Sequence, residues 1–259
     1  MKKDVNINCI EATVYEGRGK GGLVLFAHSF FGERTEDGRF DAAAEALSEK
    51  GIYCIAMDFP GFRDPERNFR SFTLDACLQS LEECYAYMTA HYDIDKNNLA
   101  LTGYSIGGKI IGLFYGRHRE FRNLVFWAGA CERDESFLGH SLREYKLKAD
   151  ENGLCDFFDA YHVCTYKMSE TLVDNLLSYD ALSCLRGFDG SALIIHGTKD
   201  ATIDPVCSRR LYESLPFCTD KRLLMLEGAD HGFGLWDGRT QDSEAIVSET
   251  VRFLSKRML

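Results

Sequence analysis

The sequence predicts an α/β fold with a mostly parallel, doubly wound sheet that has helices on both faces. Six apolar runs have the length of buried strands, and helical patterns lie between most of them. Runs without polar alternation indicate strands that are covered on both faces, and the intervening helices allow right-handed crossovers between parallel strands. A chain of 259 residues can bury one large core. The six runs are residues 23–27, 52–57, 99–102, 124–128, 192–196 and 223–226.

The remaining elements follow from the spacing of apolar residues. Residues 5–15 alternate loosely between polar and apolar side chains, which predicts an antiparallel hairpin at the edge of the sheet. Five further segments repeat apolar residues at the spacing of a helix. These predicted helices are residues 40–49, 74–91, 106–118, 206–214 and 243–256.

One interval breaks this rhythm. About sixty residues separate the strand that ends near residue 128 from the strand that begins at residue 192, which is too long for an ordinary crossover loop. We therefore predict an inserted cap at residues 131–187, after the sixth strand, and a core domain made of residues 1–130 and 188–259. The cap is rich in aromatic residues, which we interpret as its own small core with a few members lining a substrate pocket. They are Phe137, Tyr145, Phe157, Phe158, Tyr161, Tyr166 and Tyr179.

Charge and cysteine usage limit the classes of partner. The net charge is −10 and no basic run appears, which argues against a nucleic-acid partner. No stretch approaches the ~20 apolar residues of a membrane span, and the N-terminus lacks the apolar core of an export signal. The ten cysteines never form a Cys-x-x-Cys pair, which indicates free thiols and no zinc site. We expect a cytoplasmic protein that binds neither nucleic acid nor membrane.

The segment Leu-Thr-Gly-Tyr-Ser-Ile-Gly-Gly at residues 101–108 contains the candidate nucleophile, Ser105. In a Gly-x-Ser-x-Gly turn the chain passes sharply from strand to helix, and the strained serine holds its hydroxyl out of the sheet at the positive end of the helix. A surface turn uses the same residues, so the motif alone is weak evidence. Here a strand-like run precedes Ser105 and a helical pattern follows it, which favours the functional interpretation.

A serine hydroxyl needs a histidine to take its proton and an acid to orient that histidine. We predict His231 as the base, because it follows the strand at 223–226 through a short loop. We predict Asp200 as the acid, because it lies one turn past the strand at 192–196. The chain order of serine, aspartate and histidine is the order found in α/β-hydrolases.

Other residues compete for these roles. Asp204 or Glu132 could serve as the acid in place of Asp200, whereas Asp230 is merely adjacent to the base. His28 also follows a strand, but we interpret it as a structural residue that hydrogen-bonds its loop into shape.

An oxyanion hole needs two backbone donors that point at the developing negative charge. We predict the amide of Ile106, which follows the nucleophile, and the amide of Phe30, in the loop after the strand at 23–27. Aromatic residues near these positions suggest a flat apolar acyl site. The candidate substrate-binding residues are Phe31, Phe233 and Trp236.

Five segments make the chain similar to the α/β-hydrolase superfamily over nearly its full length. Within it, the chain resembles the lid-bearing cinnamoyl or feruloyl esterases and their monoglyceride-lipase-like and serine-aminopeptidase-like neighbours. The matching segments are HSFFG at 28–32, DFPGF at 58–62, GYSIGG at 103–108, HGTKDATIDP at 196–205 and GADHGF at 228–233.

Two positions depart from the pattern of these esterases. Ser29 stands where they usually have glycine beside the histidine, which adds a side chain to the predicted oxyanion loop. Residues 61–65, Gly-Phe-Arg-Asp-Pro, replace their usual Gly-His-Gly-x-Ser turn and change the wall of the site. The triad itself is untouched by either change.

The leading hypothesis is therefore a serine hydrolase that cleaves esters of small to medium acyl or aryl acids through an acyl-enzyme. A peptidase of the serine-aminopeptidase type that acts on short peptides is the alternative. A non-catalytic binding protein on a hydrolase scaffold is a third hypothesis, which the intact triad disfavours. The expected partner is a small-molecule ester, and no metal or organic cofactor is required. The oligomeric state stays open.

Overall fold

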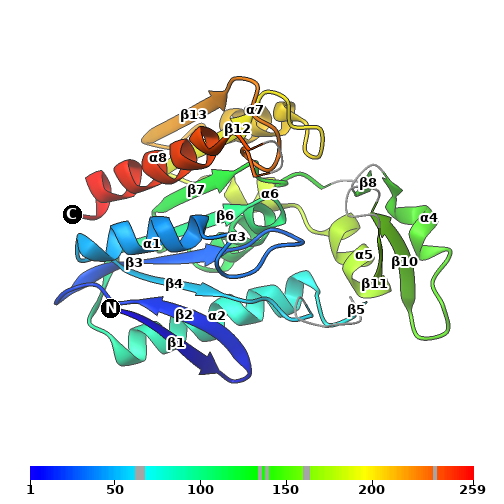
Figure 1. The fold of residues 1–259 in the computed structure, drawn as a ribbon, viewed down its shortest axis with the longest axis horizontal. Helices are drawn as coiled ribbons and strands as arrows, with labels where there is room; N and C mark the ends of the chain where they lie inside the picture. Colours follow the sequence, from blue (N-terminus) through cyan, green and yellow to red (C-terminus); the bar gives the residue numbers. More distant parts are fainter. Residues whose placement is uncertain (62–67, 134–135, 138–139, 160–163, 236–237) are drawn as a thin grey trace.

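The main feature of the structure is an eight-stranded sheet with the strand order β1-β2-β4-β3-β6-β7-β12-β13 (Figure 1). The computed structural model describes the whole chain except residues 62–67, 134–135, 138–139, 160–163 and 236–237. The β1–β2 and β2–β4 pairs are antiparallel, and the other pairs are parallel. The predicted, mostly parallel sheet with an edge hairpin is therefore confirmed. The strands are β1 (Lys2–Ile7), β2 (Ile10–Tyr15), β3 (Gly21–Ala27), β4 (Tyr53–Met57), β6 (Ile94–Tyr104), β7 (Asn123–Trp127), β12 (Ser191–Gly197) and β13 (Asp220–Leu226).

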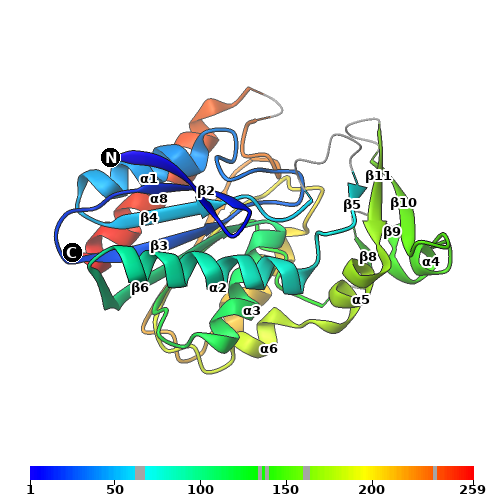
Figure 2. The same ribbon diagram turned by 90° about the horizontal axis from the view of Figure 1, so that it is seen from below.

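Helices cover both faces of this sheet (Figures 1 and 2). Two helices, α1 (Arg39–Glu49) and α8 (Thr240–Met258), pack against one face and contribute apolar side chains to one hydrophobic core. The other core is supplied by α2 (Leu74–His91), α3 (Ile106–Arg117) and α7 (Pro205–Glu213). The five predicted helices all form, and their ends lie within three residues of the predicted ones. In the part of the chain that the structure describes, no helix is long and apolar enough to cross a membrane.

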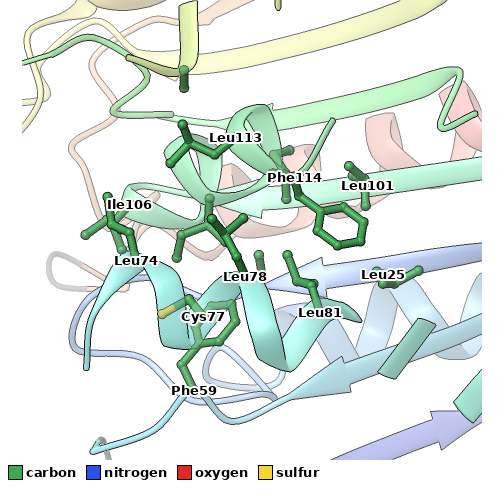
Figure 3. Packing of buried hydrophobic residues seen from close by; sticks show 14 of the residues in the cluster. Leu25, Phe59, Leu74, Cys77, Leu78, Leu81, Leu101, Ile106, Leu113 and Phe114 are labelled. Atoms are coloured by element: carbon green, nitrogen blue, oxygen red, sulfur yellow. The ribbon is translucent and has the colours of Figure 1, made fainter. Parts of the chain in front are cut away.

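The two cores arise because side chains along a strand alternate between the faces of the sheet. On β3, Leu23 and Leu25 belong to the core under α2 and α3, whereas Val24 and Phe26 belong to the core under α1 and α8. Figure 3 shows the first of these cores, where apolar side chains of α2 and α3 meet above the strands. The sheet is therefore covered on both faces, as its continuous apolar strands require.

Helix α2 begins where its capping residues place it. The Thr73 hydroxyl accepts a hydrogen bond from the Ala76 amide at 3.1 Å, which satisfies one of the free amides of the first turn. The Asn175 side-chain carbonyl accepts a second one from the Leu74 amide at 2.9 Å. Because Asn175 lies in the segment between β7 and β12, a distant part of the chain also fixes this helix end.

Between β7 and β12 the chain leaves the main sheet and builds a second, smaller one (Figure 2). In it, β10 pairs antiparallel with β11, and β11 pairs parallel with β5 (Asn68–Phe69) from the loop after β4. The sequence does not predict the elements of this segment, because its strands and helices are too short to show a clear periodicity. They are β8 (Ser136–Phe137), β9 (His140–Ser141), α4 (Leu142–Lys146), β10 (Leu154–Asp159), β11 (Cys164–Ser169), α5 (Glu170–Ser178) and α6 (Ala181–Leu185).

Shortening Leu81 to alanine should destabilise the protein by about 2–5 kcal/mol, because this α2 side chain is fully buried and a packed core relaxes only partly around the cavity left behind. Leu147→Ala makes the same chemical change at a side chain that is 87% exposed, so its stability should stay within about 0.5 kcal/mol of the wild type. Urea unfolding of the three proteins measures both effects. Equal stabilities of the two variants would contradict the packing of α2.

Candidate active site

The turn between β6 and α3 holds Ser105 in a strained backbone conformation. Its φ of 55° and ψ of −119° lie in a region that residues other than glycine rarely adopt. The neighbouring strand supports the turn, because the Ser105 amide donates to the Trp127 carbonyl and the Ala130 amide donates to the Ser105 carbonyl, each at 2.9 Å. The side chain is 8% exposed and stands at the N-terminus of α3.

Ser105, His231 and Asp200 form a hydrogen-bonded chain. His231 Nε2 lies 3.1 Å from Ser105 Oγ, and His231 Nδ1 lies 2.6 Å from Asp200 Oδ2. The three residues follow β6, β13 and β12, whose carboxyl ends meet at one edge of the parallel sheet. Nε2 can accept the serine proton while the carboxylate binds the proton on Nδ1. The structure thus brings together the three residues that the sequence predicts as a triad.

The Asp200 carboxylate has further partners. Oδ1 accepts hydrogen bonds from the amides of Thr202 and Ile203, both at 2.8 Å, and Oδ2 also lies 3.0 Å from His196 Nε2. Burial by itself would raise the pKa of Asp200, but the hydrogen bonds from His196 and His231 outweigh burial and hold the pKa well below its usual range. The acid therefore remains a carboxylate at neutral pH.

The other acids weighed from the sequence have different roles. Asp204 caps α7, since its carboxylate accepts a hydrogen bond from the Val206 amide at 2.8 Å. Glu132 forms an ion pair with Arg210 at 3.1 Å. Asp230, next to the histidine, accepts a backbone amide within its own loop at 3.3 Å. Each of these carboxylates thus has its contacts outside the serine–histidine–aspartate chain.

Two glycines allow the loops of the site to approach each other closely. A Cβ atom at Gly107 would lie 2.0 Å from the Ala27 carbonyl oxygen, and one at Gly197 would lie 2.2 Å from the Ala229 carbonyl oxygen. The first contact sets the start of α3 against the end of β3. The second sets the end of β12 against the loop that carries the histidine. Both contacts are too short for any larger residue.

The two predicted oxyanion donors lie in the segments that meet at Gly107. Ile106 is the first residue of α3, and Phe30 lies in the loop that follows β3. Both side chains are buried, and the Phe30 ring lies 5.2 Å from the rings of Phe69 and Phe72. The Ile106 side chain belongs to the core of Figure 3. This packing anchors both residues close to the serine, and their role as donors stays a prediction.

His28 has the structural role predicted for it. Its Nε2 accepts a hydrogen bond from the Phe59 amide at 2.9 Å, and its Nδ1 lies 2.7 Å from the Ser29 carbonyl oxygen. Burial lowers the pKa of His28 to about 4, so the ring is neutral at pH 7, donates from Nδ1 and accepts at Nε2. The histidine joins the loop after β3 to the loop after β4.

The three predicted substrate-binding residues have different positions. Phe31 is half-buried, and its ring lies 4.5 Å from the ring of Tyr166 on β11. Phe233 is fully buried in the core under α1 and α8, with its ring 6.0 Å from that of Tyr104, and has no exposed surface to line a pocket. Trp236 lies outside the described residues. We therefore carry Phe31 alone into the proposed substrate site.

Sequence reasoning missed two residues of the site. The sequence pattern shows His196 only as the end of a strand, although its Nδ1 lies 2.6 Å from the Ser208 hydroxyl and its Nε2 contacts the acid. The Tyr104 hydroxyl donates to the His231 carbonyl at 2.7 Å, and the two rings stack 5.3 Å apart. The position of Tyr104 inside the Gly-x-Ser-x-Gly turn was the available signal, because that residue must lie beside the nucleophile.

Comparisons with known proteins identify the family and the fold of this chain. A family profile described as the prolyl oligopeptidase family matches residues 39–258. Comparison with curated protein sequences finds no match. The ferulic acid complex of Est1E from Butyrivibrio proteoclasticus is similar over 98% of each chain, with 18% identity and a TM-score of 0.76. A monoacylglycerol lipase from Paleococcus ferrophilus matches over 94% of this chain and 99% of its own, with 17% identity and a TM-score of 0.68. These structures show the α/β-hydrolase fold.

Gly107→Ala should destabilise the protein by about 1–3 kcal/mol, because the new methyl group would collide with the backbone of β3. Gly116→Ala on the same helix is the matched control. Its methyl group would meet the movable Cys184 side chain at 3.0 Å, and alanine favours a helix by about 1 kcal/mol over glycine. Urea unfolding should therefore rank Gly107→Ala as the less stable variant, and the opposite order would rule out the close approach.

Proposed function

Since this chain belongs to the prolyl oligopeptidase family, which supports serine hydrolase activity, we propose that it cleaves carboxylic esters of small to medium acyl or aryl acids. The observation that carries this proposal is the hydrogen-bonded chain from Ser105 Oγ through His231 to Asp200. A serine hydroxyl is a weak nucleophile until an adjacent base accepts its proton. These distances support the assignment of His231 as that base and of Asp200 as the acid that orients it.

In the proposed reaction, Ser105 Oγ attacks the acyl carbon while His231 Nε2 takes the hydroxyl proton. Asp200 stabilises the resulting imidazolium and keeps its Nδ1 proton in place. The imidazolium then gives its Nε2 proton to the departing alkoxide. The acyl group remains bound to Ser105 as an ester. Water attacks this acyl-enzyme with His231 again as the base, and the free acid leaves.

Both tetrahedral intermediates have a negative oxygen that needs hydrogen-bond donors. We propose the amides of Phe30 and Ile106 for this role. The contact of Gly107 with the end of β3 supports the assignment, because it brings the loop of Phe30 to the start of α3. Preorganised donors of this kind often contribute the largest part of the stabilisation of an acyl-transfer transition state.

We propose that residues 131–187 act as a cap on the site. Lys109 of α3 is buried, and its ammonium group donates to the carbonyl of Glu132 at 2.5 Å and to that of Tyr179 at 3.3 Å. Glu132 and Tyr179 lie near the two ends of the segment. One lysine on the nucleophile helix thus ties both ends of the proposed cap to the core.

Aromatic contacts support an apolar or aryl acyl group. Tyr166 of the proposed cap lies 4.5 Å from Phe31 and 5.2 Å from Phe69, measured between ring centroids. These rings adjoin the loop that carries Phe30, so an acyl group near the proposed oxyanion hole would meet aromatic surface. Est1E, of the same fold, was solved with ferulic acid bound.

The family match also favours a second candidate, a peptidase that acts on short peptides. The same nucleophile, base and acid serve amide hydrolysis, in which His231 would protonate a leaving amine. Rates on aminoacyl anilides, compared with rates on acyl esters, separate the two candidates.

Ser105→Ala should lower the turnover of the preferred ester by several orders of magnitude, because the variant lacks the nucleophile. Initial rates of both proteins would be measured on nitrophenyl esters of rising chain length, methyl ferulate, a monoacylglycerol and an aminoacyl anilide. Unchanged turnover in the variant would refute the proposed mechanism. Reaction of the anilide alone would establish the peptidase candidate.

Asp200→Asn should lower kcat by about 10⁴-fold, because the amide cannot stabilise the imidazolium and favours the wrong histidine tautomer. Asp204→Asn is the control. It makes the same change four residues away at the cap of α7 and should leave kcat near that of the wild type. Steady-state rates on the preferred ester give both values, and equal losses in the two variants would show that the assignment of the acid is wrong.

A further inference from the structure

A buried carboxylate stands behind the loop that carries the proposed oxyanion donor. We call residues 28–32 the oxyanion loop. Glu36 is 1% exposed, and its Oε1 accepts a hydrogen bond from the Ser29 amide at 2.5 Å. The Ser29 hydroxyl also hydrogen-bonds this carboxylate. The Glu36 carboxylate thus accepts hydrogen bonds from both the amide and the hydroxyl of Ser29.

The backbone around Glu36 is strained. Glu36 has a φ of 47° and Asp37 a φ of 53°, both in the left-handed region, before Gly38 continues there at 81°. Residues with a side chain adopt this region at a cost in free energy, and such strain persists where the surroundings hold it in place. In this conformation the Glu36 side chain is buried, which is seldom found for a charged residue.

The oxyanion loop is folded tightly around this carboxylate. A Cβ atom at Gly32 would lie 2.0 Å from Glu36 Oε1 and 2.6 Å from Ser29 Oγ. The Gly32 amide also donates to the Ser29 carbonyl at 3.3 Å. The loop therefore has little freedom to move while Glu36 is in place.

The other oxygen of Glu36 connects the oxyanion loop to the rest of the site. Glu36 Oε2 lies 3.3 Å from Nη2 of the buried Arg39. Arg39 Nη1 donates to the Gly232 carbonyl at 2.8 Å, and its guanidinium lies 5.0 Å from the centre of the Tyr104 ring. Gly232 follows His231, and Tyr104 precedes the nucleophile. The ion pair therefore contacts the three segments that carry the proposed oxyanion donor Phe30, the base and the nucleophile.

We propose that Glu36 is a positioning residue that holds the oxyanion loop, through Ser29, in the geometry that points the Phe30 amide at the acyl oxygen. This inference rests on the proposed function. Ser29 stands where the esterases that the chain resembles usually have glycine, and its hydroxyl gives Glu36 a second donor in the loop. We expect the effect on kcat, because the negative oxygen develops only as the tetrahedral intermediate forms and is absent from the bound substrate.

The charge of Glu36 depends on its partners. Burial raises the pKa of Glu36 to about 7, whereas Arg39 and the two donors of Ser29 act in the opposite direction. The same groups that the carboxylate positions thus help to keep it ionised. Removing the side chain of either Arg39 or Ser29 would favour the protonated form of Glu36 and so weaken its hydrogen bonds to the oxyanion loop.

The test compares kcat and KM of Glu36→Gln, Ser29→Gly and a control, Glu33→Gln, on the ester that the wild type prefers. Glu36→Gln keeps the shape but not the charge, and we expect kcat to fall at least tenfold while KM changes less than twofold. Ser29→Gly removes the hydroxyl donor and introduces the residue that the esterases usually have at this position. We expect kcat to fall about threefold. Glu33→Gln removes the same charge from an exposed neighbour and should match the wild type.

A transition-state analogue separates positioning from general loosening of the fold. A trifluoromethyl ketone forms a tetrahedral oxyanion on the serine, so its inhibition constant should rise in Glu36→Gln by the same factor by which kcat/KM falls. Inhibition by the carboxylic acid product, which forms no such oxyanion, should not change. If both inhibition constants rise equally, Glu36 only supports the fold and the inference is wrong.

The outcomes distinguish the inference from the proposed function. Wild-type kcat in both Glu36→Gln and Ser29→Gly, in a protein that Ser105→Ala inactivates, would overturn the inference alone. Turnover that survives Ser105→Ala would overturn the proposed function first. If Glu36→Gln fails to fold in thermal unfolding, Ser29→Gly decides, because it leaves the buried ion pair intact.

Discussion

The geometry of the site depends on how closely α3 can approach the end of β3. The Gly107 backbone touches the Ala27 carbonyl, so no side chain separates the helix from the strand. Ser105 and Ile106 lie directly before Gly107, and the oxyanion loop begins directly after Ala27. One backbone contact therefore sets the distance between the nucleophile and the loop that faces it. Packing on both faces of the sheet keeps this contact in place. The same packing maintains the strained backbone of Ser105.

Two buried carboxylates stabilise the loops around this contact. Asp200 binds two histidines and two amides, and Glu36 binds an arginine and both donors of Ser29. A buried charge is costly unless it is paired and hydrogen-bonded, so each carboxylate requires its partners to stay in place. Asp200 remains ionised far below neutral pH, whereas the pKa of Glu36 is raised to about 7. Removal of a partner would therefore affect the charge of Glu36 more than that of Asp200.

The segment between β7 and β12 contacts the core through a few specific residues. Asn175 caps α2, Lys109 binds the carbonyls near both ends of the segment, and Tyr166 packs against Phe31 of the oxyanion loop. The last contact joins the proposed cap to the loop that holds the proposed oxyanion donor. A change in the cap can therefore alter both the acyl site and the loop. This is why the fold by itself does not specify the substrate.

The sequence by itself determined the elements and residues whose signals are local. The apolar strands, helix α2 and the turn at Ser105 were predicted because periodicity and turn chemistry act over a few residues. The order of Ser105, Asp200 and His231 was readable because parallel strands bring their carboxyl ends to one edge. Only the tertiary structure decided which side chains meet across long separations. The contact of His196 with Asp200 and of Arg39 with Gly232, and the burial of Phe233, depend on how distant loops pack, and no local pattern records that packing.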